Sequence, residues 1–288
     1  MDLSQVRTIG KGLSRPEGVM VGDDGTIYAA DARGCIARIE KDGKTLFWGD
    51  LGGVPNGICL DREGQVIVAN IGNGRVQSLS PQGQAVTLMT EAEGRIMGSP
   101  NFPFMDGRDR LWVSNSTARK NIDEALAEPL PDGCVVLIEK GRPRIVAEGI
   151  VFANGLTLDA KEEFLYLAET MERRILRFRI RPDGSLTDRE VYGPATLGGL
   201  GFPDGIAFDE AGNLWITFPA LNAVGYLTPE HKLVMVLEDP QGKVLKRPTN
   251  ICFGWKGRKT AFLGSLDGTT IPYFEAPFPG MKLIHQRV

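Results

Sequence analysis

The sequence predicts an all-β fold, a six-bladed β-propeller with four antiparallel strands in each blade. Three observations predict it: a strand–turn–strand unit that occurs six times, a spacing of about 46 residues between units, and 36 Gly among 288 residues. Propeller blades repeat at roughly 40–50 residues, and glycine permits the tight turns that short strands need. Because the period has no break or linker, we expect residues 1–288 to form a single domain.

Each repeat unit starts with a short apolar strand, turns at Asp or Gly, and returns in a β-branched or aromatic strand. The second unit shows this order clearly, with an apolar segment at 55–60, a turn at 61–64 and a strand at 66–70. The pattern is typical of a β-hairpin. One equivalent position near the start of each unit holds Glu17, Asn56, Asn101, Asn154, Asp204 and Thr249.

The outer strands and the closure of the ring follow from the segments between the hairpins. Most hairpins are followed by two more strand-like segments, for example 35–39 and 44–48, but the last hairpin has only 271–274 before a proline-rich tail. The segment 5–9, near the other end of the chain, has no partner of its own. We therefore expect this N-terminal strand to complete the sixth blade.

The six equivalent positions predict a polar ring at one mouth of the central channel, because the first strand of each blade lies nearest the axis. None of them is apolar, and the ring contains two carboxylates but no Lys or Arg. An Asn before Gly also stabilises turns, which would by itself account for Asn56 and Asn154. It does not account for the carboxylates, whose burial without a partner is unfavourable. Carboxylate and amide oxygens suit Ca²⁺, Mg²⁺ or Mn²⁺, so the ring predicts a cation site.

The second strand of each hairpin returns to the same mouth, and its last residue should belong to an outer ring. These residues are Asp31, Asn70, Asn115, Glu169, Phe218 and Ser265. Phenylalanines are also frequent in or beside the mouth loops, where they either line a substrate site or pack between blades: Phe102, Phe104, Phe152, Phe202 and Phe218.

Residues 117–130 form the one helix-like segment, with Asn121 and Asp123 as candidate caps. The segment lies between the second and third strands of the third blade, on the side of the mouth. It is either a lid over the channel or a surface insertion without function.

Composition excludes several other functions. Two histidines, His231 and His285, are too few for a His-rich zinc site, and both are expected to be solvent-exposed. A net charge of −3 without a basic segment argues against nucleic-acid binding. Cys35, Cys59, Cys134 and Cys252 form no C-x-x-C pair and are expected to be core thiols in a reducing compartment. The first residues lack a signal-like apolar segment and no stretch is long enough to cross a membrane, so a cytoplasmic protein is expected.

The motifs Arg15-Pro16-Glu17-Gly18, Ala153-Asn154-Gly155-Leu156 and Pro203-Asp204-Gly205-Ile206 resemble those of the gluconolactonase, regucalcin (SMP-30) and luciferin-regenerating enzyme family. The resemblance implies a six-bladed propeller with one divalent cation, most often Ca²⁺, with Mn²⁺, Mg²⁺ or Zn²⁺ as alternatives. It also implies that Glu17, Asn154 and Asp204 hold the cation and that Asn101 is a ligand or substrate contact.

The sequence departs from the sugar-lactone members of this family in the third blade. Ser99 stands where many of them have Arg, and Asn101 continues as Phe102-Pro103 rather than Asp-Gly. No acidic residue for sugar hydroxyls is evident in 116–120. These changes favour a lactone or ester less polar than a sugar lactone.

The leading hypothesis is a metal-dependent lactonase acting on a small molecule, in which the cation polarises the ester carbonyl and Asp204 is the general base. Asn56, Asn101, Phe102, Asn115 and Glu169 are the predicted substrate contacts. Two alternatives remain open: a metal hydrolase acting on phosphotriesters or aryl esters, and a non-catalytic scaffold of the NHL-repeat type.

Overall fold

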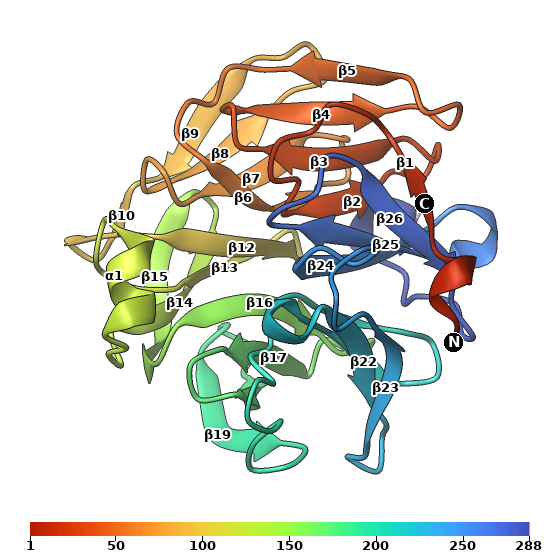
Figure 1. Cartoon of the computed structure of the whole chain (residues 1–288). Helices are drawn as coiled ribbons and strands as arrows, with labels where there is room; N and C mark the ends of the chain where they lie inside the picture. Colours follow the sequence, from red (N-terminus) through yellow and green to blue (C-terminus); the bar gives the residue numbers. More distant parts are fainter. Residues whose placement is uncertain (288) are drawn as a thin grey trace.

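A computed structural model of the chain describes residues 1–287, so residue 288 of the expected domain lies outside the described part. Six four-stranded antiparallel sheets follow one another along the chain and surround a central axis, which confirms the predicted propeller (Figure 1). Among residues 1–287, no helix is long and apolar enough to cross a membrane.

The strands of the first three blades run from the axis outward in chain order. Blade 1 contains β2 (Val19–Val21), β3 (Ile27–Asp31), β4 (Cys35–Ile39) and β5 (Thr45–Trp48); blade 2 contains β6 (Pro55–Leu60), β7 (Val66–Asn70), β8 (Arg75–Leu79) and β9 (Ala85–Met89); blade 3 contains β12 (Pro100–Met105), β13 (Leu111–Asn115), β14 (Gly133–Glu139) and β15 (Arg142–Ile150). A small hairpin of β10 (Glu91–Ala92) and β11 (Arg95–Ile96) precedes blade 3.

The other three blades repeat this arrangement. Blade 4 contains β16 (Ala153–Leu158), β17 (Phe164–Glu169), β18 (Arg174–Ile180) and β19 (Leu186–Tyr192); blade 5 contains β20 (Ile206–Phe208), β21 (Leu214–Phe218), β22 (Ala223–Leu227) and β23 (Leu233–Glu238); blade 6 contains β24 (Pro248–Gly254), β25 (Thr260–Ser265), β26 (Ile271–Glu275) and β1 (Arg7–Ile9). Short 3₁₀ helices occur at η1 (Leu3–Gln5), η2 (Pro219–Leu221), η3 (Lys256–Arg258) and η4 (Ile284–Gln286).

The ring closes as expected, through pairing of the N-terminal strand with the last strands of the chain. β1 runs antiparallel to β26, with Arg7 opposite Tyr273 and Ile9 opposite Ile271. This pairing gives blade 6 its fourth strand and joins the first strand of the chain to the last ones.

The helical segment is shorter than expected. Within residues 117–130, only α1 (Ile122–Ala127) is helical. Asn121 is the N-cap, and its side chain accepts a hydrogen bond from the Asp123 backbone N–H at 3.1 Å, so Asp123 belongs to the first turn. Pro129 and Pro131 follow, and because proline disfavours helical backbone in the preceding residue, the helix ends before them.

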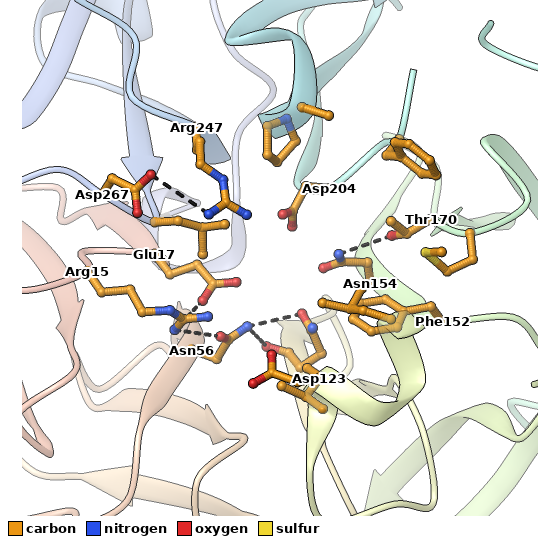
Figure 2. A pocket seen from close by; sticks show the side chains of 18 residues that line it. Arg15, Glu17, Asn56, Asp123, Phe152, Asn154, Thr170, Asp204, Arg247 and Asp267 are labelled. Atoms are coloured by element: carbon orange, nitrogen blue, oxygen red, sulfur yellow. Dashed lines mark hydrogen bonds and ion pairs between the residues drawn. The ribbon is translucent and has the colours of Figure 1, made fainter. Parts of the chain in front are cut away.

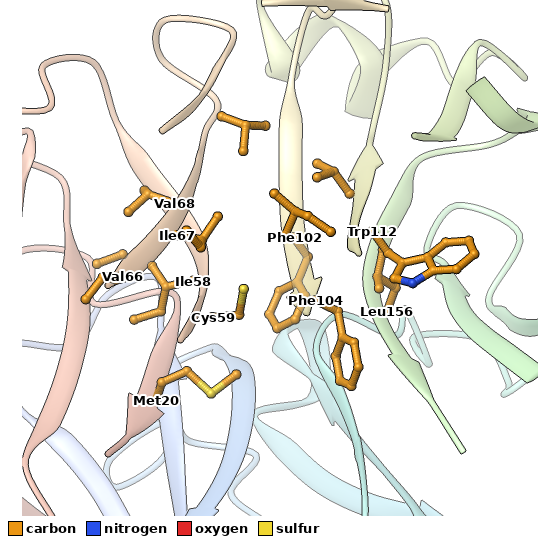
Figure 3. Close-up of a cluster of buried hydrophobic side chains, with 14 of the residues drawn as sticks. Met20, Ile58, Cys59, Val66, Ile67, Val68, Phe102, Phe104, Trp112 and Leu156 are labelled. Carbon is orange, nitrogen blue, oxygen red and sulfur yellow. The ribbon is translucent and has the colours of Figure 1, made fainter. Parts of the chain in front are cut away.

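The inner strands pack against one another around the axis, and their apolar side chains fill the channel below the mouth. Met20, Phe102, Phe104 and Leu156 line the narrow space there (Figure 3). Met281 and Leu283 of the C-terminal tail close the far end, leaving a cavity of only about 20 Å³. The end of the channel opposite the polar mouth is therefore sealed by a well-packed core.

Glycine lets neighbouring inner strands approach closely beside the mouth. A Cβ atom on Gly155 would lie 2.4 Å from the Asp204 carbonyl oxygen of the next blade. The Gly155 N–H instead donates to that carbonyl at 3.1 Å. This contact ties Asn154 and Asp204 to adjacent positions in the ring.

One expectation about the histidines was wrong. His231 is exposed, but His285 is buried, and its Nε2 lies 3.0 Å from the carbonyl oxygen of Val21. The reason is that the C-terminal tail folds back across the sealed end of the channel instead of projecting into solvent. The four cysteines are free thiols, three of them buried and Cys35 partly buried.

Candidate active site

A cavity of about 520 Å³ opens at the mouth where the inner strands begin (Figure 2). Glu17, Asn56, Asn101, Asn154 and Asp204 all line it, so the structure brings together five of the eight predicted site residues. They come from blades 1 to 5, one from each blade, because each occupies the equivalent repeat position, within two residues of the first residue of an inner strand. Thr249, the equivalent residue of blade 6, turns away and donates to the Glu17 carbonyl oxygen at 3.0 Å.

Glu17 and the two neighbouring amides form a connected polar edge. Arg15 Nη1 lies 2.5 Å from Glu17 Oε2 and donates a hydrogen bond to Asn56 Oδ1 at 3.1 Å. Asn56 Nδ2 in turn donates to Asn101 Oδ1 at 3.2 Å, and Asn101 Nδ2 donates to Ser116 Oγ at 2.9 Å. This chain of contacts fixes the orientation of both amides.

Asn154 presents an oxygen without a partner. Its Nδ2 donates to Thr170 Oγ1 at 3.1 Å, which turns Oδ1 toward the cavity beside Asp204 (Figure 2). Among residues 1–287, no donor reaches this buried oxygen, and Glu17 Oε2 has its ion pair but no hydrogen bond of normal geometry. A buried acceptor without a donor is unfavourable unless a ligand or ion satisfies it.

The two carboxylates are destabilised as anions. Burial raises the pKa of Glu17, and Arg15 partly opposes this effect. The pKa of Asp204 lies well above its usual range, because burial and then the negative charge of Glu17 both favour the protonated form. Two nearby carboxylates with raised pKa values are expected where a cation binds between them.

The residues present fit a divalent cation with oxygen ligands. Glu17 and Asp204 supply charge, and Asn154 supplies a free amide oxygen aimed at the same space. In the part of the chain that the structure describes, no group of three or more His, Cys, Asp or Glu is placed to hold a metal. A site here therefore depends on amide oxygens as well as carboxylates, which Ca²⁺ accepts readily.

The predicted ring contains no Lys or Arg, but this prediction did not consider the arginines of the adjacent loops. The ring positions themselves carry none, but Arg15 and Arg247 line the cavity from the preceding loops. Each stands two residues before a ring position. The sequence repeat gives this spacing, but it does not give the direction of these side chains.

The outer-ring residues do not line the cavity, which corrects the prediction that Asn115 and Glu169 contact substrate. Asn115 Oδ1 accepts from the Ser99 backbone N–H at 3.1 Å, and Glu169 Oε1 accepts from the Val151 N–H at 2.9 Å. Glu169 also pairs with Arg174 at 2.7 Å. Asp31 and Asn70 accept equivalent backbone hydrogen bonds, so this ring holds the mouth loops in place.

The phenylalanines of the mouth loops divide between the cavity and the core. Phe152 and Phe202 line the cavity. Phe102, predicted as a substrate contact, lies deeper in the channel with Phe104, because its side chain points down the inner strand. Phe218 is fully buried between blades.

Several cavity residues were not predicted from the sequence. Most of them lie one or two residues after an outer-ring residue, at equivalent positions of blades 4, 5 and 6: Thr170, Met171, Pro219, Ala220, Leu266 and Asp267. Aligning the repeats at this position would have identified them. The segment 117–130 contributes Ile122, Asp123 and Leu126, so α1 forms part of the cavity wall.

Comparison with known proteins agrees with this architecture. The sequence model for the SMP-30/gluconolactonase/LRE-like region matches residues 104–267, more than half of the chain. The chain belongs to this family. A model for the N-terminal part of strictosidine synthase-like proteins matches residues 1–39.

Curated relatives of this family member are distant. It is 26% identical to strictosidine synthase-like protein 6 of Arabidopsis thaliana over 76% of the chain and 60% of that protein. It is 25% identical to a gluconolactonase of Zymomonas mobilis over 73% of the chain and 60% of that protein. The chain thus spans about three fifths of the length of these relatives.

Solved structures share the fold at lower identity. A gluconolactonase from Xanthomonas campestris superposes with a TM-score of 0.78 at 20% identity, covering 94% of this chain and 89% of that one. The calcium-binding protein regucalcin from Agrobacterium tumefaciens superposes with a TM-score of 0.76 at 17% identity, covering 97% and 95%.

Proposed function

We propose that this protein is a divalent-metal-dependent lactonase that opens a small cyclic ester. The observation that carries the proposal is the convergence of Glu17, Asp204 and the unpartnered Asn154 oxygen at the mouth of a family propeller. Family membership makes hydrolysis of a lactone the first reaction to test, and it implies a small-molecule substrate. The regucalcin likeness favours Ca²⁺ as the first cation to test.

Glu17, Asn154 and Asp204 would hold the cation, through carboxylate and amide oxygens. When bound, such a cation withdraws electron density from an ester carbonyl and stabilises the negative charge that develops on its oxygen. Asp204 would accept the proton of the attacking water, because a bound cation would lower the pKa of that water and the carboxylate would lie beside it. Arg15 and the Asn56–Asn101 pair would keep the polar edge of the cavity oriented.

The proposed substrate has a more apolar carbon skeleton than a sugar lactone. The cavity wall includes the apolar side chains of Phe152, Phe202 and Leu126, which cannot hydrogen-bond to sugar hydroxyls. Apolar walls with a few fixed polar groups are typical of sites for small, partly apolar ligands.

The test is a pH-indicator assay of purified protein with Ca²⁺, Mn²⁺, Mg²⁺ or Zn²⁺ against lactones that range from sugar to alkyl and aryl. Metal content is measured on the same samples by elemental analysis. We expect cation-dependent hydrolysis that disappears with chelator, and faster turnover of alkyl or aryl lactones than of sugar lactones.

Two outcomes would overturn the proposal. Hydrolysis of phosphotriesters without hydrolysis of lactones would support the alternative metal hydrolase. Failure to bind any divalent cation, together with no turnover, would support a non-catalytic propeller.

A further inference from the structure

The cavity wall has two chemically different sides. The residue two positions before the ring residue is Arg15 in blade 1 and Arg247 in blade 6, which are neighbours around the ring. At the same position, blades 4 and 5, also neighbours, carry Phe152 and Phe202. All four side chains line the cavity. The repeat therefore places two guanidinium groups on one side and two phenyl rings on another.

The backbone holds Arg247 in position. It has a φ of 51°, which is uncommon for residues other than glycine. Its N–H donates to Asn222 Oδ1 at 2.8 Å, and its carbonyl accepts from the Leu266 N–H at 3.1 Å. These bonds fix the backbone of Arg247 and so the direction of its Cα–Cβ bond. Its guanidinium extends toward Asp204 and Glu17 (Figure 2).

The two arginines differ in the polar contacts that their guanidinium groups make. Arg15 is engaged with Glu17 and Asn56. Arg247 has one long ion pair, 3.8 Å to Asp267, and its guanidinium donates no hydrogen bond among residues 1–287. Because a guanidinium carries five N–H donors in a planar fork, Arg247 can still bind a carboxylate through two parallel hydrogen bonds.

A bound divalent cation would remove the net negative charge that otherwise opposes an anion in the cavity. Arg15 and Arg247 balance Glu17 and Asp204, and Asp123 and Asp267 add two negative charges, which a bound divalent cation would cancel. An incoming carboxylate can replace Asp267 beside Arg247, because their present contact is long and both side chains are more than half exposed.

The opposite side offers an apolar surface. Met171, Pro219 and Ala220 extend the surface of Phe152 and Phe202. The guanidinium of Arg173 lies 5.6 Å from the Phe202 ring centre, which supports that ring from outside.

We propose that Arg247 determines specificity and that the substrate is an acidic lactone or ester, with a carboxylate at Arg247 and an apolar carbon skeleton against Phe152 and Phe202. The proposal rests on the proposed function for the reacting ester. In the reaction, the acyl C–O bond breaks, the water oxygen joins the acyl carbon, one water proton goes to the departing alkoxide, and the new carboxylic acid releases another. A lactone gives one product with a hydroxyl and two carboxylates, whereas an open-chain ester releases the hydroxyl on a separate alcohol.

The first experiment compares an aryl-substituted γ-lactone bearing a carboxymethyl group with its primary amide, which is neutral and of similar shape. We expect wild-type kcat/KM for the acid to exceed that for the amide by roughly tenfold to a hundredfold. Arg247→Gln should abolish the preference, and Arg247→Lys should restore part of it. Arg75→Gln, at an exposed position outside the cavity, should keep it.

The second experiment measures binding without turnover. Calorimetry with 4-phenylbutanoate and 4-phenylbutanamide, on protein freed of cation and on protein with Ca²⁺, separates the contribution of Arg247 from that of the metal. We expect Arg247→Gln to weaken binding of the acid at least tenfold in both states and to leave binding of the amide unchanged.

Equal binding of acid and amide by the wild type, or an unchanged acid affinity in a folded Arg247→Gln variant, would overturn the assignment. Selective acid binding without turnover of any lactone would instead reject the proposed function and retain the anion site. Thermal unfolding of each variant shows that the comparison is made on folded protein.

Discussion

The two ends of the channel are built from the same six strands, yet their chemistry is opposite. At the mouth, the strands begin with polar residues, of which Glu17 and Asp204 carry charge. Four residues further along each strand, every equivalent position is apolar: Val21, Leu60, Met105, Leu158, Phe208 and Phe253. The mouth opens into a cavity of about 520 Å³, whereas the other end leaves about 20 Å³.

The difference shows how one strand serves two purposes. Its buried end contributes to the free energy of folding, and this contribution permits unfavourable burial of carboxylates and an unpartnered amide at the other end. Mutations at the two ends should therefore separate activity from stability.

The largest effect is expected at the mouth. Asp204→Asn and Glu17→Gln should each lower kcat/KM for a lactone substrate by roughly 10²–10⁴-fold, through loss of a proton acceptor or of a cation ligand. The cation-free Asp204→Asn variant should unfold at the same temperature as the wild type or a higher one, since its repulsion with Glu17 is removed. Glu17→Gln also loses the ion pair with Arg15. Asp50→Asn, which changes an exposed carboxylate, is the matched control. Full activity in either site variant would contradict this view of the mouth.

At the sealed end, Phe253→Ala should lower stability and leave activity unchanged. Phe253 is 5% exposed, and its ring lies 5.7 Å from that of Trp215. Its truncation should lower the free energy of unfolding by about 3–5 kcal/mol and leave kcat of the folded enzyme unchanged. Urea unfolding and activity measurements check both parts, and Phe47→Ala on an outer strand provides the control, where Phe47 is 43% exposed. A large fall in kcat with little loss of stability would refute the separation.

Gly155→Ala should affect both properties, because Gly155 connects two ring residues. The new methyl group would meet the Asp204 carbonyl oxygen and move the strands apart. We expect a destabilisation of about 1–3 kcal/mol together with weaker cation binding. Gly199→Ala, in open space, should change neither. Calorimetric titration with Ca²⁺ and thermal unfolding would reveal the coupling, and unchanged affinity would disprove it.

The mouth should also respond to pH. Burial raises the pKa of Glu17 and of Asp204 in the folded state, so without cation their contribution to stability is present below the unfolded value of about 4 and is lost as pH rises through the folded values. A cation replaces the protons. The rise in melting temperature caused by Ca²⁺ should therefore be larger at about pH 8 than at about pH 5, and Glu17→Gln should reduce it. Equal rises at both pH values would be inconsistent with this origin.

The smallest effect is expected from His285, whose titration affects stability in the opposite direction. Burial lowers the pKa of His285, so its contribution to stability is present above the unfolded value of about 6.5 and is lost as pH falls through the folded value. His285→Gln should reduce the pH dependence of stability in acid, with a change of about 1 kcal/mol at neutral pH. His231→Gln serves as the exposed control, and urea unfolding at several pH values distinguishes them. Identical pH profiles for the wild type and His285→Gln would rule out this role.

The fold could be predicted from the sequence because hairpin chemistry recurs in register. Each unit repeats a polar start, an apolar strand and an Asp or Gly turn, and strand order then follows from chain order. The inner ring could be predicted for the same reason: Glu17, Asn154 and Asp204 occupy one repeated position, so symmetry brings them to one mouth.

The remaining parts of the site depend on tertiary hydrogen bonds that periodicity does not contain. Arg15, Phe152 and Arg247 have positive φ values, and such backbone is held by partners distant in sequence, as Asn222 holds Arg247. Glu169 occupies a mouth position, but its carboxylate is used by Val151 and Arg174. A repeat places a residue, whereas its neighbours decide which way its side chain points.

The closure of blade 6 has a consequence for synthesis. β1 leaves the ribosome before any complete blade, yet its partner β26 is made after five blades have followed. During that interval β1 and the growing arc of blades expose unpaired strand edges, and the last contact to form is among the most distant in sequence. The nascent chain is thus most open to misassembly or to binding by chaperones just before the final strands appear, and the pairing of β1 with β26 then completes the last blade.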